Sequence, residues 1–121
     1  MKKRILVVDD DTMNLKRAER ILKDKYEVVL AQSGKEALDF IICQEFDLVL
    51  LDIAMPEMDG IETFKRMKEF AWGNIPVIFL TASGDESDVR NAIKLGAINY
   101  LKKPFPTQEL LNRVATGLEK K

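Results

Sequence analysis

Five short apolar runs alternate with five amphipathic segments along this chain of 121 residues, and this alternation limits the folds open to it. The apolar runs occupy residues 5–8, 26–30, 48–52, 76–80 and 98–101, and each has the length of a β-strand. The segments 12–23, 34–43, 61–70, 85–95 and the one that follows residue 107 repeat apolar residues near the helical period. Strands that alternate with helices predict one α/β domain, over residues 1–121, built on a parallel sheet.

Strand composition indicates the order of the strands in this sheet. The first, third and fourth runs are apolar on both faces, which is typical of central strands. Glu27 lies inside the second run and Asn99 inside the fifth, so these two belong at the edges. With right-handed crossovers, the order 2-1-3-4-5 satisfies these conditions. It predicts a flavodoxin-like, doubly wound (βα)5 fold.

Polar residues gather where the predicted strands end. Ligands of such a sheet bind outside the carboxyl ends of the strands, where the winding reverses between strands one and three. The residues placed there are Asp9 and Asp10 after the first strand, Asp52 at the end of the third, Thr81 at the end of the fourth, and Lys102 and Lys103 after the fifth. From its strand alone, Asp52 is equally well interpreted as a nucleophile or as a residue that merely ends the strand.

Several carboxylates in one crevice repel one another, and a hard divalent cation relieves that repulsion. Oxygen ligands with room for water suit Mg²⁺. An aspartate beside such an ion can accept a phosphoryl group and form an aspartyl-phosphate. A lysine and a hydroxyl group would stabilise the added negative charge, and both residue types are present among the predicted neighbours.

Composition excludes several other functions. The 20 acidic and 19 basic residues leave a net charge of −1, so nucleic acid is not an expected direct ligand. The apolar run after the basic N-terminus is too short for a signal peptide or a membrane span, and the protein is expected to be cytoplasmic. The absence of histidine excludes phosphorylation on histidine and histidine-ligated metal sites.

Four apolar positions in two helical segments are expected to lie inside the fold. Cys43 is the only cysteine and falls within an apolar helical pattern, which favours a small core residue. In the segment 85–95 the helical period predicts that Val89, Ala92 and Ile93 are buried.

Four short motifs resemble the receiver domain of two-component response regulators. They are Val-Val-Asp-Asp-Asp at residues 7–11, Leu-Asp-Ile-Ala-Met-Pro-Glu-Met-Asp-Gly at 51–60, Leu-Thr-Ala at 80–82, and Gly-Ala at 96–97 leading into Tyr-Leu-Lys-Lys-Pro-Phe at 100–105. Each motif alone is weak, but the four occur in the family's order over essentially the whole chain. Together, the four motifs are therefore highly specific for this family.

The resemblance implies a role for each residue at these motifs. Asp52 would accept phosphate from a phosphohistidine on a sensor histidine kinase or a histidine phosphotransfer protein. Asp10, Asp52 and the backbone carbonyl of Ala54 would bind Mg²⁺, which Mn²⁺ can replace, and Asp9 would assist through a water molecule. Thr81 would bond the phosphoryl group, Tyr100 would change rotamer with it, and Lys103 would contact the acceptor. The Lys103-Pro104 bond would be cis.

Three classes of function follow from these observations. The first is a phosphorylation-operated switch that is not a turnover enzyme, acts on an output domain or effector, and could form a homodimer when phosphorylated. The second is a Mg²⁺-dependent aspartyl-phosphate phosphohydrolase, which would need a further carboxylate where Ala54 stands. The third is a flavin-binding module, but the aspartates at 9–11 are hostile to a phosphate group. The first reading is preferred.

Overall fold

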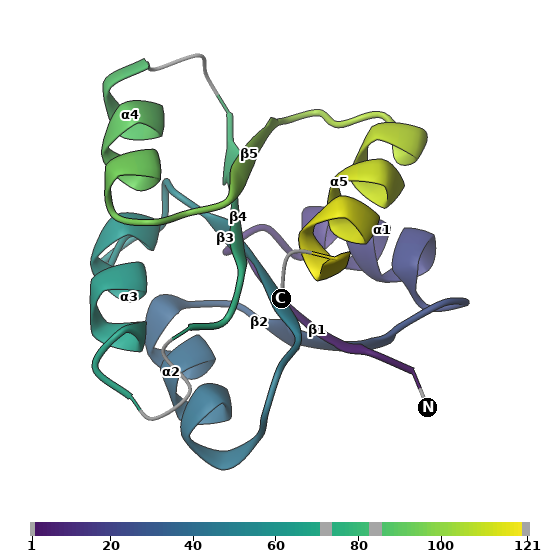
Figure 1. Ribbon diagram of the computed structural model, residues 1–121, viewed down its shortest axis with the longest axis horizontal. Helices are drawn as coiled ribbons and strands as arrows, with labels where there is room; N and C mark the ends of the chain where they lie inside the picture. Colours follow the sequence, from purple (N-terminus) through teal and green to yellow (C-terminus); the bar gives the residue numbers. More distant parts are fainter. Residues whose placement is uncertain (1, 71–73, 83–85, 120–121) are drawn as a thin grey trace.

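The computed structural model describes residues 2–70, 74–82 and 86–119 and contains one five-stranded parallel sheet (Figure 1). The strands are β1 (Arg4–Val8), β2 (Glu27–Ala31), β3 (Leu48–Asp52), β4 (Val77–Thr81) and β5 (Asn99–Lys102). Their order is β2-β1-β3-β4-β5, which confirms the predicted flavodoxin-like topology. The observed strand ends differ from the predicted ones by a single residue, except at β3, where they agree.

Five helices cover the two faces of the sheet. They are α1 (Thr12–Leu22), α2 (Gly34–Cys43), α3 (Gly60–Met67), α4 (Glu86–Lys94) and α5 (Thr107–Glu119). Helices α1 and α5 lie on one face, and α2, α3 and α4 lie on the other (Figure 1). The predicted start of the fourth helix, at residue 85, lies outside the described residues.

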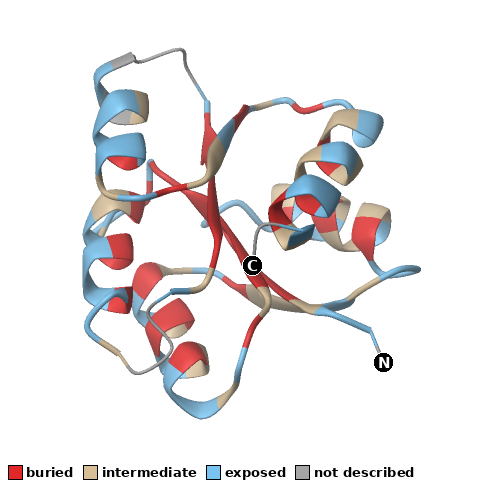
Figure 2. Cartoon of the chain, in the orientation of Figure 1, coloured by how far each residue is buried: buried red, intermediate tan, exposed pale blue. Residues whose placement is uncertain are grey.

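Strand burial explains the order of the sheet. Every residue of β3 and β4 is buried, because both strands have a neighbour on each side and helices on both faces (Figure 2). In contrast, β2 and β5 contain exposed residues and lie at the edges, as Glu27 and Asn99 predicted. One apolar cluster packs under α1 and α5, and a second packs under α2, α3 and α4.

Three of the helices are capped at their N-terminus by a side chain that accepts a hydrogen bond from a backbone N–H. Asp11 accepts from Met13 N at the start of α1, Ser33 accepts from Glu36 N at the start of α2, and Asp59 accepts from Glu62 N at the start of α3. Each of these bonds satisfies a backbone N–H that the helix itself leaves unpaired. Two of these helices, α1 and α3, are the ones that follow β1 and β3, whose ends carry the aspartates.

Two predictions about burial are wrong. Ile93 is 46% exposed, although its neighbour Ala92 is fully buried, because consecutive residues of a helix point about 100° apart and α4 turns Ala92 inward. Cys43 is also exposed, since it is the last residue of α2 and Ile41 is the last buried side chain of that helix.

Within the described residues, no helix is long and apolar enough to cross a membrane.

Candidate functional site

Three aspartates meet at the carboxyl ends of β1 and β3. Asp9 directly follows β1, Asp10 comes next in the chain, and Asp52 is the last residue of β3. One carboxylate oxygen from each lies within 4.8 Å of the other two. Asp9 is fully buried and Asp52 is 1% exposed, whereas Asp10 is exposed. The site therefore has two buried carboxylates at its base and one at its mouth.

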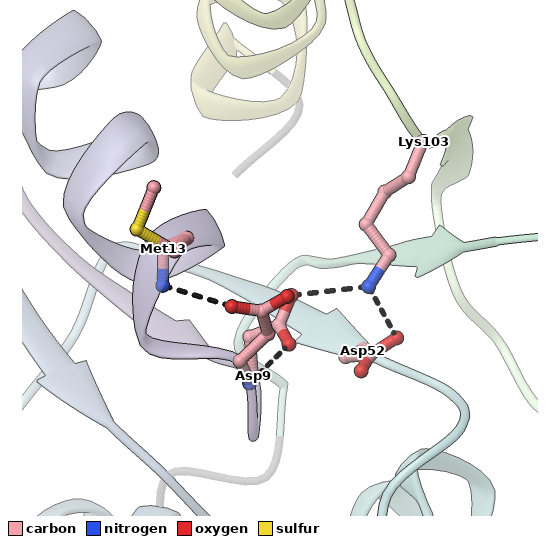
Figure 3. Close-up of polar contacts among 5 residues, drawn as sticks. Asp9, Met13, Asp52 and Lys103 are labelled. Carbon is pink, nitrogen blue, oxygen red and sulfur yellow. Dashed lines mark hydrogen bonds and ion pairs between the residues drawn. The ribbon is translucent and has the colours of Figure 1, made fainter.

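Lys103 joins the two buried carboxylates. Its Nζ lies 3.1 Å from Asp9 Oδ2, to which it donates a hydrogen bond, and 3.1 Å from Asp52 Oδ1 (Figure 3). The second contact is an ion pair without hydrogen-bond alignment, so Asp52 Oδ1 has no hydrogen-bond partner. Lys102, one residue earlier, is exposed. Of the two lysines after β5, Lys103 is therefore the one that contacts the buried carboxylates.

The backbone around Lys103 is held close to β4. Lys103 N donates to Thr81 O at 2.7 Å, and the following Lys103-Pro104 peptide bond is cis, as the resemblance implied. Phe105 then packs into the apolar cluster under α1 and α5. The loop after β5 is thus bound at both ends, which keeps the lysine side chain directed at the aspartates.

Asp9 also organises the start of α1. Its Oδ1 accepts from Asp11 N at 2.9 Å, while Asp11 Oδ1 accepts from Met13 N at 2.9 Å (Figure 3). Asp11 is therefore a helix-capping residue, and Asp9 divides its two oxygens between this turn and Lys103. These bonds leave Asp9 less available than Asp10 for direct contact with an ion.

The pKa of Asp52 is raised to about 6. Burial is the largest cause, since it disfavours the charged form, and the charge of Asp9 adds to it, while Lys103 acts in the opposite direction. The pKa of Lys103 is also raised. Burial alone would lower it, but the charges of Asp52 and Asp9 outweigh burial. The site thus has a surplus of negative charge that one lysine does not neutralise.

Gly60 allows α3 to begin beside the strand that carries Asp52. A Cβ atom at this position would lie 2.2 Å from the Asp52 carbonyl oxygen and 2.8 Å from Ile53 Cα. Only glycine permits so close an approach of two backbones. The pair Asp59-Gly60 is typical of a turn, but it does not indicate that Gly60 contacts β3.

The other residues predicted for the site come from β4, from the loop after β3 and from β5. Thr81 is 6% exposed at the end of β4, the strand next to β3, where Leu80 pairs with Asp52. Ala54 is exposed, two residues after Asp52. Tyr100 lies further away on the edge strand β5, pairs with Phe79, and is 42% exposed.

The donor set fits a hard divalent cation. Three carboxylates in reach of one another, with a single ammonium group, leave two negative charges uncompensated when all four are ionised. All three side chains offer oxygen, which is the ligand type that Mg²⁺ prefers. Burial and this excess of negative charge also raise the pKa of Asp52. A buried carboxylate beside like charge would gain most from a nearby cation.

Comparisons with known proteins agree with this geometry. The family model described as response regulator receiver domain matches residues 5–115. The transcriptional regulatory protein CrdR of Helicobacter pylori is 42% identical over 115 residues, which cover 94% of this chain and 54% of CrdR. A putative response regulator from Chloroflexus aurantiacus is 36% identical with a TM-score of 0.92, covering 98% of this chain and 99% of that structure.

A beryllofluoride-activated receiver domain of DrrB is 34% identical with a TM-score of 0.88, covering 98% of this chain and 99% of the other. The chain belongs to the receiver domains of response regulators, which are in general signalling switches rather than turnover enzymes. It spans about half the length of curated relatives such as CrdR.

Proposed function

We propose that this chain is a phosphorylation-dependent switch in which Asp52 accepts a phosphoryl group from a phosphohistidine. The donor would be a sensor histidine kinase or a histidine phosphotransfer protein. One observation supports this most strongly: the Asp52 carboxylate ends a central strand, is almost fully buried, and lies 3.1 Å from Lys103 beside two further carboxylates. A carboxylate that only ended a strand would not need these neighbours.

The transfer step makes one bond and breaks one. A carboxylate oxygen of Asp52 forms a bond to phosphorus as the phosphorus–nitrogen bond of the donor breaks. The imidazole leaves with the bonding electron pair and regains a proton from solvent. The Lys103 ammonium group, already paired with Asp52, would stabilise the charge that develops on the phosphoryl oxygens.

Mg²⁺ would be held by Asp10, Asp52 and the backbone carbonyl of Ala54, with Asp9 assisting through a water molecule, and Mn²⁺ could replace it. When bound, the ion supplies positive charge that attracts the donor phosphate and lowers repulsion from the aspartates. The proposal is supported by the three oxygen donors within reach of one another and by the exposure of Asp10 at the mouth of the site.

Phosphorylation would then act on Thr81 and Tyr100. Thr81 ends the strand next to β3 and would donate its hydroxyl to the phosphoryl group, and Tyr100 would change rotamer on β5. The affected surface would be built from α4, β5 and α5, and it could contact an output domain, an effector or a second copy of the chain. Sedimentation with and without beryllofluoride tests the homodimer, and a monomer in both states would contradict it.

Incubation with acetyl phosphate and Mg²⁺ tests the acceptor. Intact mass should show one added phosphoryl group on the wild type and none on Asp52→Asn. Asp11→Asn is a matched control, because it removes a nearby carboxylate but keeps a good helix cap, and it should be labelled normally. Slow loss of a stoichiometric label supports the switch. Many turnovers would instead indicate the phosphohydrolase.

A further inference from the structure

Arg113 on α5 holds the strand β5 by two hydrogen bonds. Its Nη1 atom donates to Tyr100 O and to Asn99 Oδ1, both at 2.7 Å. Its Nη2 atom lies 3.2 Å from Glu109 Oε1, one helical turn earlier on α5. The Arg113 side chain is 34% exposed. A guanidinium group with three acceptors in fixed directions is held in one orientation.

Asn99 completes this contact from the strand. Its Oδ1 accepts from Arg113 Nη1 and also from Tyr100 N at 2.9 Å. Two donors point at the same atom, so the amide oxygen, and not the amide nitrogen, must occupy that position. The backbone of Tyr100 is therefore bonded through its N–H to Asn99 and through its carbonyl to Arg113.

The Tyr100 side chain lies on the opposite face of the sheet. Asn99 bonds to α5, and Leu101 packs in the cluster under α1 and α5. Because side chains alternate along a strand, Tyr100, between these two residues, points to the face covered by α4. The backbone of Tyr100 is thus bonded to α5, while its side chain, 42% exposed, points to the other face of the sheet.

We infer that Arg113 is a positioning residue that couples the backbone of Tyr100 to α5. The edge strand β5 has a sheet neighbour on one side only. Without Arg113, β5 could shift alone when the Tyr100 side chain changes its conformation. With Arg113, the same change of Tyr100 also moves α5. The position of α5 would then depend on whether Asp52 is phosphorylated. The coupling rests on the proposed function, whereas the hydrogen bonds themselves do not.

The chain offers a matched control for Arg113→Gln. Arg66 on α3 makes the same kind of contact with a glutamate one turn earlier, at 3.1 Å from Glu62, and is more exposed. Arg66→Gln therefore removes an equivalent ion pair on a different helix, α3. Asn99→Ala removes the shared acceptor from the strand side, and Asn99→Asp keeps it.

The first measurement uses unphosphorylated protein and NMR spectroscopy. In Arg113→Gln the Tyr100 carbonyl carbon should shift, and amide hydrogen exchange in residues 99–102 should accelerate on the order of tenfold, as expected for loss of charged hydrogen bonds. Asn99→Ala should reproduce this result, and Arg66→Gln and Asn99→Asp should not. An unchanged Tyr100 carbonyl shift in Arg113→Gln would overturn the contact itself.

The second measurement adds beryllofluoride and Mg²⁺. Arg113→Gln should bind beryllofluoride with the affinity of the wild type, judged from amide shifts next to Asp52, but the accompanying shifts of residues 110–118 in α5 should be lost. If Arg113 only stabilised the fold, beryllofluoride would still shift residues 110–118 in Arg113→Gln. Their persistence in Arg113→Gln would overturn the coupling. Absence of any shift next to Asp52 in the wild type would instead contradict the proposed function, and the first measurement would still decide the contact.

Discussion

At the scale of single residues, the Asp52 carboxylate lies in an unfavourable electrostatic environment. The carboxylate is almost fully buried beside Asp9, and its pKa rises from 3.8 to about 6. The folded state therefore binds this proton more tightly than the unfolded state does. Ionising Asp52 lowers the stability contributed by this group as the pH rises through the window between these two values. A destabilised residue at this position is consistent with a site made to receive a cation and a phosphoryl group.

Replacing Asp52 should therefore stabilise the protein in a way that depends on pH. Without divalent ions, we expect Asp52→Asn to raise the free energy of unfolding by about 1–3 kcal/mol near neutral pH, and to give almost no gain near pH ~4, where Asp52 is protonated in the folded state. Urea denaturation at several pH values measures this. A gain that is constant with pH would show that the charge of Asp52 is not the cause.

Glu57 is a second residue whose conformation is unfavourable. It lies in the loop between β3 and α3 and adopts a φ of 67°, the only positive φ of a non-glycine residue in the described part of the chain. Side chains with a Cβ atom rarely adopt this region, and no pattern in the sequence indicates it here, since glycine or asparagine would be the usual residue.

The strain at Glu57 predicts a stabilising substitution. Glu57→Gly should raise the free energy of unfolding by ~0.5–1 kcal/mol, since relief of backbone strain exceeds the entropy that glycine adds to the unfolded chain. Thermal or urea unfolding measures the change. Glu57→Ala removes the same charge but keeps the Cβ atom and should give no gain. Equal gains in both variants would attribute the effect to charge instead.

Among the elements, α5 depends on one small residue for its close approach to the sheet. A Cβ atom at Gly117 would lie 2.7 Å from Leu48 Cδ1 and 2.8 Å from Ile98 Cδ1. Leu48 is fully buried at the start of β3, so its side chain has little space to move. Gly117 therefore sets the distance between α5 and the strand that carries Asp52.

Gly117→Ala should destabilise the protein, although alanine favours helices more than glycine does. The expected net loss is up to about 2 kcal/mol, because an overpacked core costs about 1–3 kcal/mol and the gain in helix propensity offsets ~1 kcal/mol of it. Thr116→Ala, at the exposed neighbouring position, should be neutral or slightly stabilising and is the control. Chemical denaturation compares the two. A more stable Gly117→Ala would mean that α5 can move away from the sheet without cost.

For the whole molecule, the winding of the sheet brings distant parts of the chain to one edge. Asp9 and Lys103 are 94 positions apart in sequence, yet their side chains are 3.1 Å apart. Asp52 comes from a third part of the chain. The site exists only when β1, β3 and β5 are all in place, so a ligand of the site should stabilise the entire fold.

Mg²⁺ should therefore raise the unfolding temperature of the wild type. In several-fold excess over its dissociation constant, Mg²⁺ should add about 1 kcal/mol of stability, because it binds the folded state only. Differential scanning fluorimetry with Mg²⁺ and with EDTA measures the shift. Asp10→Asn should lose most of it, and Asp11→Asn, whose side chain caps α1, should keep it. A shift retained in Asp10→Asn would place the ion elsewhere.

The sequence by itself determined the topology and the residues at the site. Apolar runs that occupy both faces of a strand mark the central strands, charged or polar residues such as Glu27 and Asn99 mark the edges, and right-handed crossovers leave one order that suits them. Because parallel strands end at the same edge of a sheet, the side chains at their carboxyl ends could be named before their distances were known. Strand ends alone left Lys102 and Lys103 as alternatives, and only the family resemblance favoured Lys103.

Only the tertiary structure decided the features that depend on packing between distant elements. Helical periodicity predicts a face to within about a residue, and so it wrongly placed Ile93 and Cys43 in the core, although both are exposed. The close approach at Gly60, the contact of Arg113 with Tyr100 and the contact of Asp9 with Lys103 each join separate strands, helices or loops. Their distances follow from how helices settle on the sheet, which local sequence patterns do not specify.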